Sequence, residues 1–475
     1  MHPGRPDLSA AGQRLMLKTL IALAIISVLA LAVGLWPGGL GQLDNAWRYL
    51  RQGGWHHAGR LGALSSEEQR WAAIAWRYFQ NNSQAASALV NGQDNYPVIS
   101  SGQIGDTLVA LVAARRLALI NEAEFDRRLS PLLATLSRLP LTEPGLPNRY
   151  YDTQRLTPVN AARQPAADGW SATGIARLLL GLRLVGLAAP QYGEFIDRLL
   201  LGWNFCPLLD PQGQVLDGER RDGRWQTHPI SDVAQSQYAA AVLGLWGFDA
   251  RRSAAPPYKR IIIGPTQIDV GTRDPRLGGG NLSVDSTPYL LAGLEFNWTP
   301  PGKAALSLSD LRQRAQAVYQ AQAWRWQSQG VLTARANYVL NQAPWRIDNS
   351  LFANGYPWNV VSEEGQYRPE LALIATRAVF GLWVLWDSPY TDALMQLGRF
   401  PYDAQRGWYE GRFEHNAQYN PALTLTTNAM VLEALLYKAN NGPLIPRLAV
   451  TTGYLDILLR EPVNWPRHCL PQEGR

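Results

Sequence analysis

The amino-acid sequence predicts an all-α protein, an (α/α)6 toroid of about twelve helices with a small β-hairpin insertion, preceded by one N-terminal transmembrane helix. Three observations predict this fold class. Apolar residues recur at i, i+3, i+4 and i+7 along most of the chain, helices that are apolar on all sides alternate with amphipathic ones, and an uncharged stretch lies near the N-terminus. With 46% hydrophobic and 17% charged residues among 475, the chain is neither disordered nor fibrous.

The N-terminal stretch 19–36 has 18 residues without a charge and follows Arg5, Arg14 and Lys18. It is long enough to span a membrane, and the positive-inside rule places the basic side in the cytoplasm. The alternative is a cleaved signal peptide, because the segment 30–32 has the small-x-small spacing of a cleavage site. We expect the uncleaved anchor, in a single-pass inner-membrane protein whose main domain is periplasmic. The expected parts are a cytoplasmic tail (1–15), a signal anchor (16–37), a tether (38–60), the toroid (61–460) and a C-terminal tail (461–475).

The helices are recognised by apolar spacing and by their start signals. Ser66 precedes two glutamates, and Asn121 with Glu124 forms a capping box. Two β-branched runs on either side of Gly264 and Pro265 predict the one hairpin, over 260–270. The expected helices are 67–80, 106–119, 122–139, 171–187, 190–203, 231–247, 286–296, 307–329, 369–386, 391–397, 426–438 and 447–459.

Six of these helices are apolar on almost every side, whereas 122–139 and 307–329 have a wide charged face. A helix that is apolar all round must be buried on all sides, so the six are expected to form an inner ring that the others cover. The alternative is a generic all-α domain or a pair of domains. No low-complexity linker divides the chain after residue 60, which favours one toroid. The expected inner helices are 106–119, 171–187, 231–247, 286–296, 369–386 and 426–438.

The charge and the cysteines exclude several classes of function. The net charge of +6 is small for this length, and the basic residues are scattered, which argues against nucleic acid as a partner. No metal-ligand spacing, nucleophile elbow, P-loop or dinucleotide fingerprint occurs, so no metal or cofactor is expected. Cys206 and Cys469 are the two cysteines. A bond between them is compatible with an oxidising compartment and is left open.

The segments between helices are rich in aromatic and amide residues. Aromatic faces stack on sugar rings while amide and charged groups bind the hydroxyls, so these segments predict a saccharide cleft at one end of the toroid. The alternative is that the aromatic side chains pack the loops onto the core. The expected stacking residues are Trp170, Tyr289, Trp408 and Tyr409, with Arg377 and Asn428 as polar clamps.

Carboxylates are the second requirement, because glycoside hydrolysis uses two of them, roughly 6.5–9.5 Å apart for inversion. Glu410 lies in a glycine-flanked segment against two aromatic residues, a setting typical of a general acid. Asp106 at the start of an apolar helix is the expected base that activates water, and Asp168 or Glu295 is the next partner to test. Helix capping explains Asp106 and Asp168 equally well. Glu295 and Glu433 lie in apolar helices, where each needs a partner, and a nearby arginine such as Arg377 is the expected one.

Together these motifs resemble a bacterial family known as domain of unknown function 3131, whose members are similar in pattern to six-hairpin, glucoamylase-like glycosidase toroids. The resemblance implies an exported, membrane-tethered toroid associated with cell-surface or periplasmic polysaccharide. The residues that carry it are 75–79, Asp106 with 107–120, 146–150, 169–171, 238–240, 288–289, 293–295, 332–333, 407–411, 427–429 and 432–435.

The chain departs from that family pattern at several positions. The pattern has acids where this sequence has Thr173, Gln237, Thr287 and Asn337, and a tryptophan where it has Gly105. The expected function is therefore a membrane-anchored periplasmic protein that acts on polysaccharide, as an inverting glycoside hydrolase or a related enzyme. The alternative is a non-catalytic glycan-binding or scaffold protein of a polysaccharide synthesis or export complex, which the loss of four acids favours.

Overall fold

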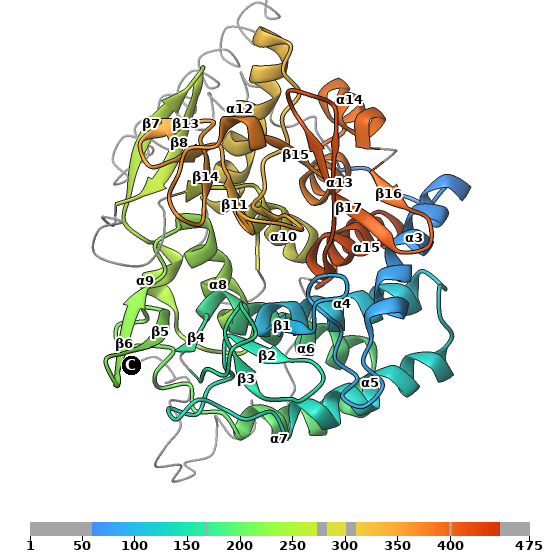
Figure 1. Cartoon of the computed structure of the whole chain (residues 1–475), viewed down its shortest axis with the longest axis vertical. Helices are drawn as coiled ribbons and strands as arrows, with labels where there is room; N and C mark the ends of the chain where they lie inside the picture. Colours follow the sequence, from blue (N-terminus) through green and yellow to red (C-terminus); the bar gives the residue numbers. More distant parts are fainter. Residues whose placement is uncertain (1–58, 168, 273–282, 301–309, 399–400, 447–475) are drawn as a thin grey trace, which may run out of the picture. The chain divides into compact units, whose positions relative to one another are not determined.

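Six apolar helices close into a ring in the protein, whose computed structural model describes residues 59–167, 169–272, 283–300, 310–398 and 401–446. Each ring helix contacts the next one, and the last returns to the first. All six are buried along most of their length, as their all-round apolar sequences require. In chain order they are α4 (Ser101–Arg116), α6 (Ala172–Ala188), α8 (Val233–Leu245), α10 (Thr287–Phe296), α13 (Thr376–Leu385) and α15 (Leu425–Ala439) (Figure 1).

A second set of helices pairs with the ring. α5 packs on α4, α7 on α6, α9 on α8, α12 on α10, α14 on α13 and α3 on α15. These pairs confirm the predicted mostly helical fold, with an inner and an outer helix in each hairpin. The outer helices are α3 (Ser66–Asn82), α5 (Glu122–Leu136), α7 (Gly193–Leu201), α9 (Arg251–Ala254), α12 (Leu311–Gln329) and α14 (Pro389–Gly398).

Short strands occupy the connections, and there are more of them than the single predicted hairpin. That hairpin is present, formed by β7 (Tyr258–Ile263) and β8 (Thr266–Gly271). One sheet contains β1 (Val98–Ser100), β2 (Tyr150–Asp152) and β3 (Pro158–Val159), and another β4 (Gly169–Trp170), β5 (Leu216–Arg221) and β6 (Arg224–Pro229). β9 (Ser283–Val284), β12 (Phe352–Ala353) and β13 (Tyr356–Pro357) form a third, and β10 (Tyr338–Val339), β11 (Arg346–Asn349) and β14 (Val360–Ser362) a fourth. The last joins β15 (Leu373–Ala375), β16 (Tyr402–Asp403), β17 (Gly407–Phe413) and β18 (Tyr419–Leu423).

Two predicted helix starts are wrong, one because of helix capping and the other because of strand pairing. α4 begins at Ser101 and not at Asp106, because Ser100 and Gln103 form a reciprocal capping box. Asp106 therefore lies in the second turn of the helix. The block predicted as a helix over 369–386 starts with a 3-10 turn, η3 (Pro369–Leu371), followed by β15, since residues 373–375 pair with β17. A second 3-10 turn, η1 (Pro190–Tyr192), precedes α7.

α4 and α6 cross at very short distance, and glycine permits it. A Cβ on Gly105 would lie 2.2 Å from the carbonyl oxygen of Arg177, and one on Gly181 would lie 2.7 Å from the carbonyl oxygen of Gly105. Real side chains do not reach such contacts. The crossing brings Asp106 of α4 beside Arg177 of α6, which determines the centre of the site described below.

Several predictions fall on other parts of the chain. The signal anchor, most of the tether, the helix predicted over 447–459 and the C-terminal tail lie outside the described residues. Within the described ranges, no helix has both the length and the apolar composition needed to cross a membrane. Cys206 is disulfide-bonded. Cys469 lies outside the described residues.

Candidate functional site

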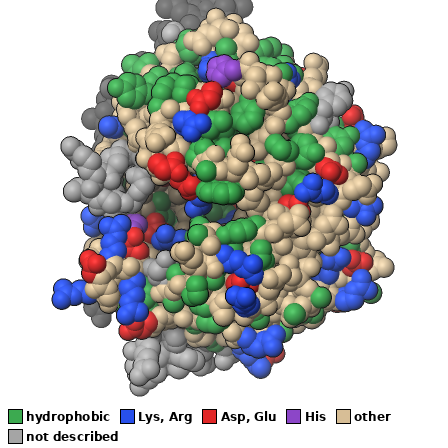
Figure 2. Space-filling view, viewed as in Figure 1, with side chains coloured by type: hydrophobic (Ala, Val, Ile, Leu, Met, Phe, Trp, Pro, Cys, Tyr) green, Lys and Arg blue, Asp and Glu red, His purple; other side chains and the backbone are tan. Residues whose placement is uncertain are grey.

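A cavity of about 290 Å³ lies where five of the six ring helices begin. It appears as a hollow near the middle of the face shown in Figure 2. Because these helices present their N-terminal turns to the same space, their positive dipole ends converge on it. The ring contributes Ser101, Gly102, Gln103 and Asp106 from α4, Thr173, Gly174 and Arg177 from α6, Gln235 and Tyr238 from α8, Pro288 and Leu291 from α10, and Thr426 from α15. Ser100, Arg149, Tyr150, Ser171 and Arg346 complete the lining.

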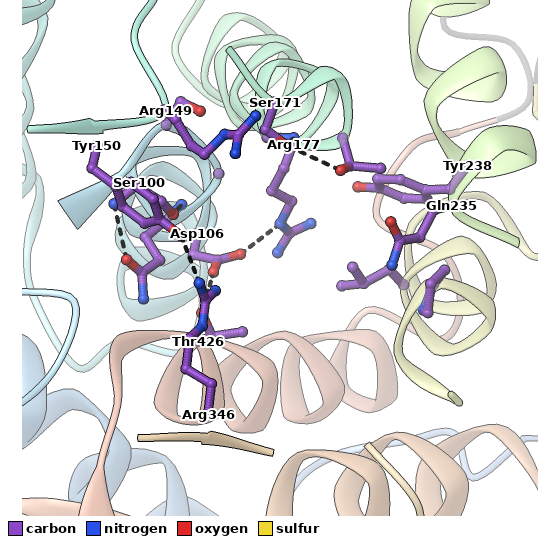
Figure 3. Close-up of a pocket in the computed structure, with 17 residues that line it drawn as sticks. Ser100, Asp106, Arg149, Tyr150, Ser171, Arg177, Gln235, Tyr238, Arg346 and Thr426 are labelled. Carbon is purple, nitrogen blue, oxygen red and sulfur yellow. Dashed lines mark hydrogen bonds and ion pairs between the residues drawn. The ribbon is translucent and has the colours of Figure 1, made fainter. Parts of the chain in front are cut away.

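Arg177 is the centre of a buried charge network on this cavity (Figure 3). Its Nε lies 2.6 Å from Oδ1 of Asp106, and its Nη2 lies 2.7 Å from Oε2 of Glu433. Its Nη1 pairs with Glu295. The second oxygen of Asp106 accepts a hydrogen bond of 2.9 Å from the Thr426 hydroxyl. Three carboxyl groups from three ring helices therefore share one guanidinium.

This network has too many acids for its one base. Burial raises the pKa of Glu295 well above its ordinary value, and burial also raises the pKa of Glu433. The Tyr238 hydroxyl donates to Oε1 of Glu295 at 3.0 Å, whereas Oε2 of Glu295 and Oε1 of Glu433 are buried and have no hydrogen-bond partner among the described residues. The raised pKa values favour a protonated carboxyl group beside Arg177.

Glu410, the predicted general acid, belongs to a second network that does not line the cavity. It is fully buried on β17, and its Oε2 accepts a hydrogen bond of 2.7 Å from Arg377. Its Oε1 accepts hydrogen bonds from the hydroxyls of Thr424 and Thr427. The carboxylate thus joins β17 to the first turn of α15, and its donors occupy both oxygens.

The predicted stacking residues are packed against protein. Trp408 is fully buried, and its ring contacts Trp71, Phe380 and Tyr402. Trp170 is 1% exposed. Its indole N–H donates to the Leu216 carbonyl at 2.9 Å, and its ring covers Gly218.

Tyr289 is 2% exposed, and burial raises its pKa. Tyr409 is half-buried. The two predicted polar clamps are also engaged, since Asn428 holds the backbone N–H of Trp408 at 2.8 Å and Arg377 binds Glu410.

Among the ten predicted site residues, Asp106 lines the cavity, and Asp168 lies outside the described residues. Sequence reasoning assigned no role to Arg149, Tyr150 or Arg346, although the first two lie in an aromatic segment that it singled out. It also passed over Arg177. A single arginine inside a helix that is otherwise apolar was the signal for a buried partner, and Glu295 and Glu433 pair with this residue and not with Arg377.

A metal site has no support among these groups. In the part of the chain that the structure describes, no cluster of three or more His, Cys, Asp or Glu side chains is arranged to hold a metal ion.

The sequence profile of the family described as "Protein of unknown function (DUF3131)" matches residues 70–441. Solved structures with a similar fold include a proposed glucoamylase from Bacteroides caccae, 12% identical with a TM-score of 0.53, which covers 78% of this chain and 94% of its own. An endo-β-1,2-glucanase from Chitinophaga pinensis, in complex with sophorotriose and glucose, is 11% identical with a TM-score of 0.53 over 79% of this chain and 93% of its own. A β-1,2-glucanase from Parabacteroides distasonis is 12% identical with a TM-score of 0.52, over 80% of this chain and 57% of its own. Among curated proteins, no sequence matches this one.

Proposed function

The chain belongs to the DUF3131 family, and we propose that it is a carbohydrate-active protein that binds a polysaccharide in the cavity at the start of the ring helices and cleaves its glycosidic bonds there. The observation that carries this proposal is the place of Asp106. It is a carboxylate on the lining of a cavity at one end of a helical ring, and the ring has the fold of proteins described as glucanases. The sophorotriose and glucose bound to one of those proteins make a saccharide the natural ligand to test first.

Asp106 is the residue to which we assign the base that activates water. Arg177 and Thr426 fix the direction of its two oxygens, and each carboxylate oxygen has a second lone pair free to accept a proton. Burial raises the pKa values of Glu295 and Glu433, which limits the negative charge near Asp106. We place Glu410 outside the chemistry, since it does not line the cavity.

To test this proposal, the turnover of a panel of polysaccharides that includes β-1,2-glucan is measured for the wild type and two matched variants. Asp106→Asn keeps the shape of the side chain and removes the base, so turnover should fall by about 10²–10⁴-fold while the fold persists. Glu410→Gln should lower the stability and retain turnover. The reverse result, with turnover lost in Glu410→Gln and kept in Asp106→Asn, would return the chemistry to Glu410.

A second candidate is a non-catalytic glycan-binding protein, and one observation favours it. Asp106 is the one carboxylate that lines the cavity among the described residues, whereas hydrolysis uses a pair. If the wild type binds glycans and cleaves none of them, this candidate replaces the enzyme. If it neither binds nor cleaves any saccharide, both candidates fail.

The location of the protein is part of the same proposal. The uncharged stretch 19–36 behind three basic residues supports a single-pass inner-membrane anchor with the domain in the periplasm, where a polysaccharide synthase or export complex is the proposed partner. A reporter fused after residue 60 should be exported and remain with the membrane. A soluble mature form that begins at Val33 would instead show a cleaved signal peptide.

A further inference from the structure

We infer that the cavity selects an acidic saccharide, a sugar chain whose carboxylate binds between Arg149 and Arg346. This inference rests on the proposed function and adds the chemical class of the ligand. It is carried by the charge of the lining: three arginines and one carboxylate surround the cavity.

The one carboxylate does not balance the other two arginines. Asp106 is already paired with Arg177, which also holds Glu295 and Glu433. Arg149 and Arg346 form no ion pair with any described carboxylate, in contrast to most arginines of the ring. Two positive charges on the lining are therefore available to a ligand.

Arg149 is poorly satisfied by the protein. Its Nη2 donates to the carbonyl oxygens of Trp170 and Gly218 at 3.4 and 3.5 Å, the outer limit of a hydrogen bond. Its Nε is buried without a partner, and its Nη1 donates to no described protein atom. A half-buried guanidinium in this state gains more from an anion than from a neutral group, because charge-assisted hydrogen bonds are about twice as strong as neutral ones.

Arg346 faces the same cavity from a different part of the chain. It is exposed on β11, and the one hydrogen bond that its side chain forms with a described residue joins its Nη1 to the hydroxyl of Tyr150 at 3.0 Å. Tyr150 directly follows Arg149 in the chain, and Figure 3 shows Arg149 and Arg346 on either side of Asp106, so the two cations reach the cavity from different directions. Tyr150 also offers a half-buried aromatic ring for a sugar face.

The lining also contains a buried hydroxyl group without a hydrogen-bond partner in the described part of the chain. The hydroxyl of Ser101 is fully buried, lines the cavity and has no partner among the described residues. It lies in the first turn of α4, where the helix dipole favours negative charge. A planar carboxylate matches this setting, because an arginine guanidinium can bind both of its oxygens side by side.

The experiment compares acidic oligosaccharides with their own neutral forms. Oligomers of glucuronate, galacturonate and mannuronate are each used before and after reduction of the carboxyl group, next to neutral β-1,2-gluco-oligosaccharides, and binding is measured by calorimetry. At least one acid should bind about tenfold more tightly than its reduced form at low salt. The difference should shrink as salt is added, because salt screens the charges.

The variants Arg149→Gln and Arg346→Gln should each weaken binding of that acid by about tenfold and change binding of the neutral form by less than about twofold. Arg224→Gln, at the exposed first residue of β6, is the matched control and should change neither. If neutral oligosaccharides bind as well as the acids and the two variants do not distinguish them, the inference is wrong and the proposed function stands. If no saccharide binds, the proposed function fails with it.

Discussion

Two buried arginine–carboxylate networks meet the first turn of α15, and they differ in what surrounds them. Thr426 donates to Asp106, the partner of Arg177, whereas Thr424 and Thr427 donate to Glu410, the partner of Arg377. The Arg377 network is closed: its carboxylate is fully buried and both oxygens have donors. The Arg177 network opens to the cavity through Asp106 and Arg177.

The difference lies also in the balance of charge. Arg377 holds one carboxylate, but Arg177 holds three, and the excess negative charge is relieved by the raised pKa values of Glu295 and Glu433. A balanced and sealed ion pair joins elements of the fold. An unbalanced network with raised carboxyl pKa values at a cavity leaves polar groups for a ligand, which is typical of a functional site.

The largest expected effect is the loss of stability on removing each arginine. Arg177→Met leaves three buried carboxyl groups without their cation and should lower the free energy of unfolding by about 3–5 kcal/mol. Arg377→Met leaves one carboxylate, still bound by two threonine hydroxyls, and should cost about 1–3 kcal/mol. Urea denaturation of both variants measures the difference. Equal losses of unfolding free energy would show that the two networks contribute equally to stability, contrary to this prediction.

The close crossing that positions the Arg177 network provides the next test. Gly105→Ala would force α4 away from the Arg177 carbonyl and should lower the free energy of unfolding by about 1–3 kcal/mol. Ligand affinity should fall as well, because Asp106 and Arg177 move apart. Gly193→Ala is the matched control, since nothing lies within 4 Å of the added methyl group. Unchanged ligand affinity in Gly105→Ala would show that ligand binding does not depend on the close crossing of α4 and α6.

The helical ring could be predicted from the sequence because each inner helix is apolar on every side, a pattern that only burial explains. The strands could not. β17 contains two glycines and three aromatic residues, and that composition fits a loop as well as a strand. β17 pairs with β15, which lies more than 30 residues earlier in the chain, and its pairing with β18 depends on the register of the two strands. Local sequence patterns predict neither of these.

The site was predicted in part for a related reason. The local sequence does not show whether a buried carboxylate joins two elements, as Glu410 does, or faces a cavity, as Asp106 does. Asp106 reaches the cavity from α4, and its position beside Arg177 depends on the crossing of α4 and α6. Arg149 and Arg346 are almost 200 residues apart in the sequence, so no local pattern indicates that both line the same cavity.

The smallest expected effect is on the pH dependence of the free energy of unfolding, and it reports the protonation of Glu295 beside Arg177. Burial raises the pKa of Glu295 well above its ordinary value of 4.5, so the folded protein keeps this proton at pH values where the unfolded chain has released it. Such a group stabilises the fold fully below pH 4.5, and this contribution is lost as the pH rises toward the folded-state pKa. The free energy of unfolding should therefore fall with rising pH, by at most about 1.4 kcal/mol per pH unit for this proton.

Glu295→Gln separates this contribution from the rest of the protein. The amide retains an acceptor for the Tyr238 hydroxyl and cannot titrate, so the stability of the variant should depend less on pH and gain on the wild type with each unit above pH 5. Gly193→Ala keeps every titrating group and leaves the crossing of α4 and α6 unchanged, so it should follow the wild-type slope. If the curves of stability against pH are parallel for Glu295→Gln and the wild type, Glu295 does not have a raised pKa in the folded protein. The Arg177 network would then differ from the Arg377 network only in its access to the cavity.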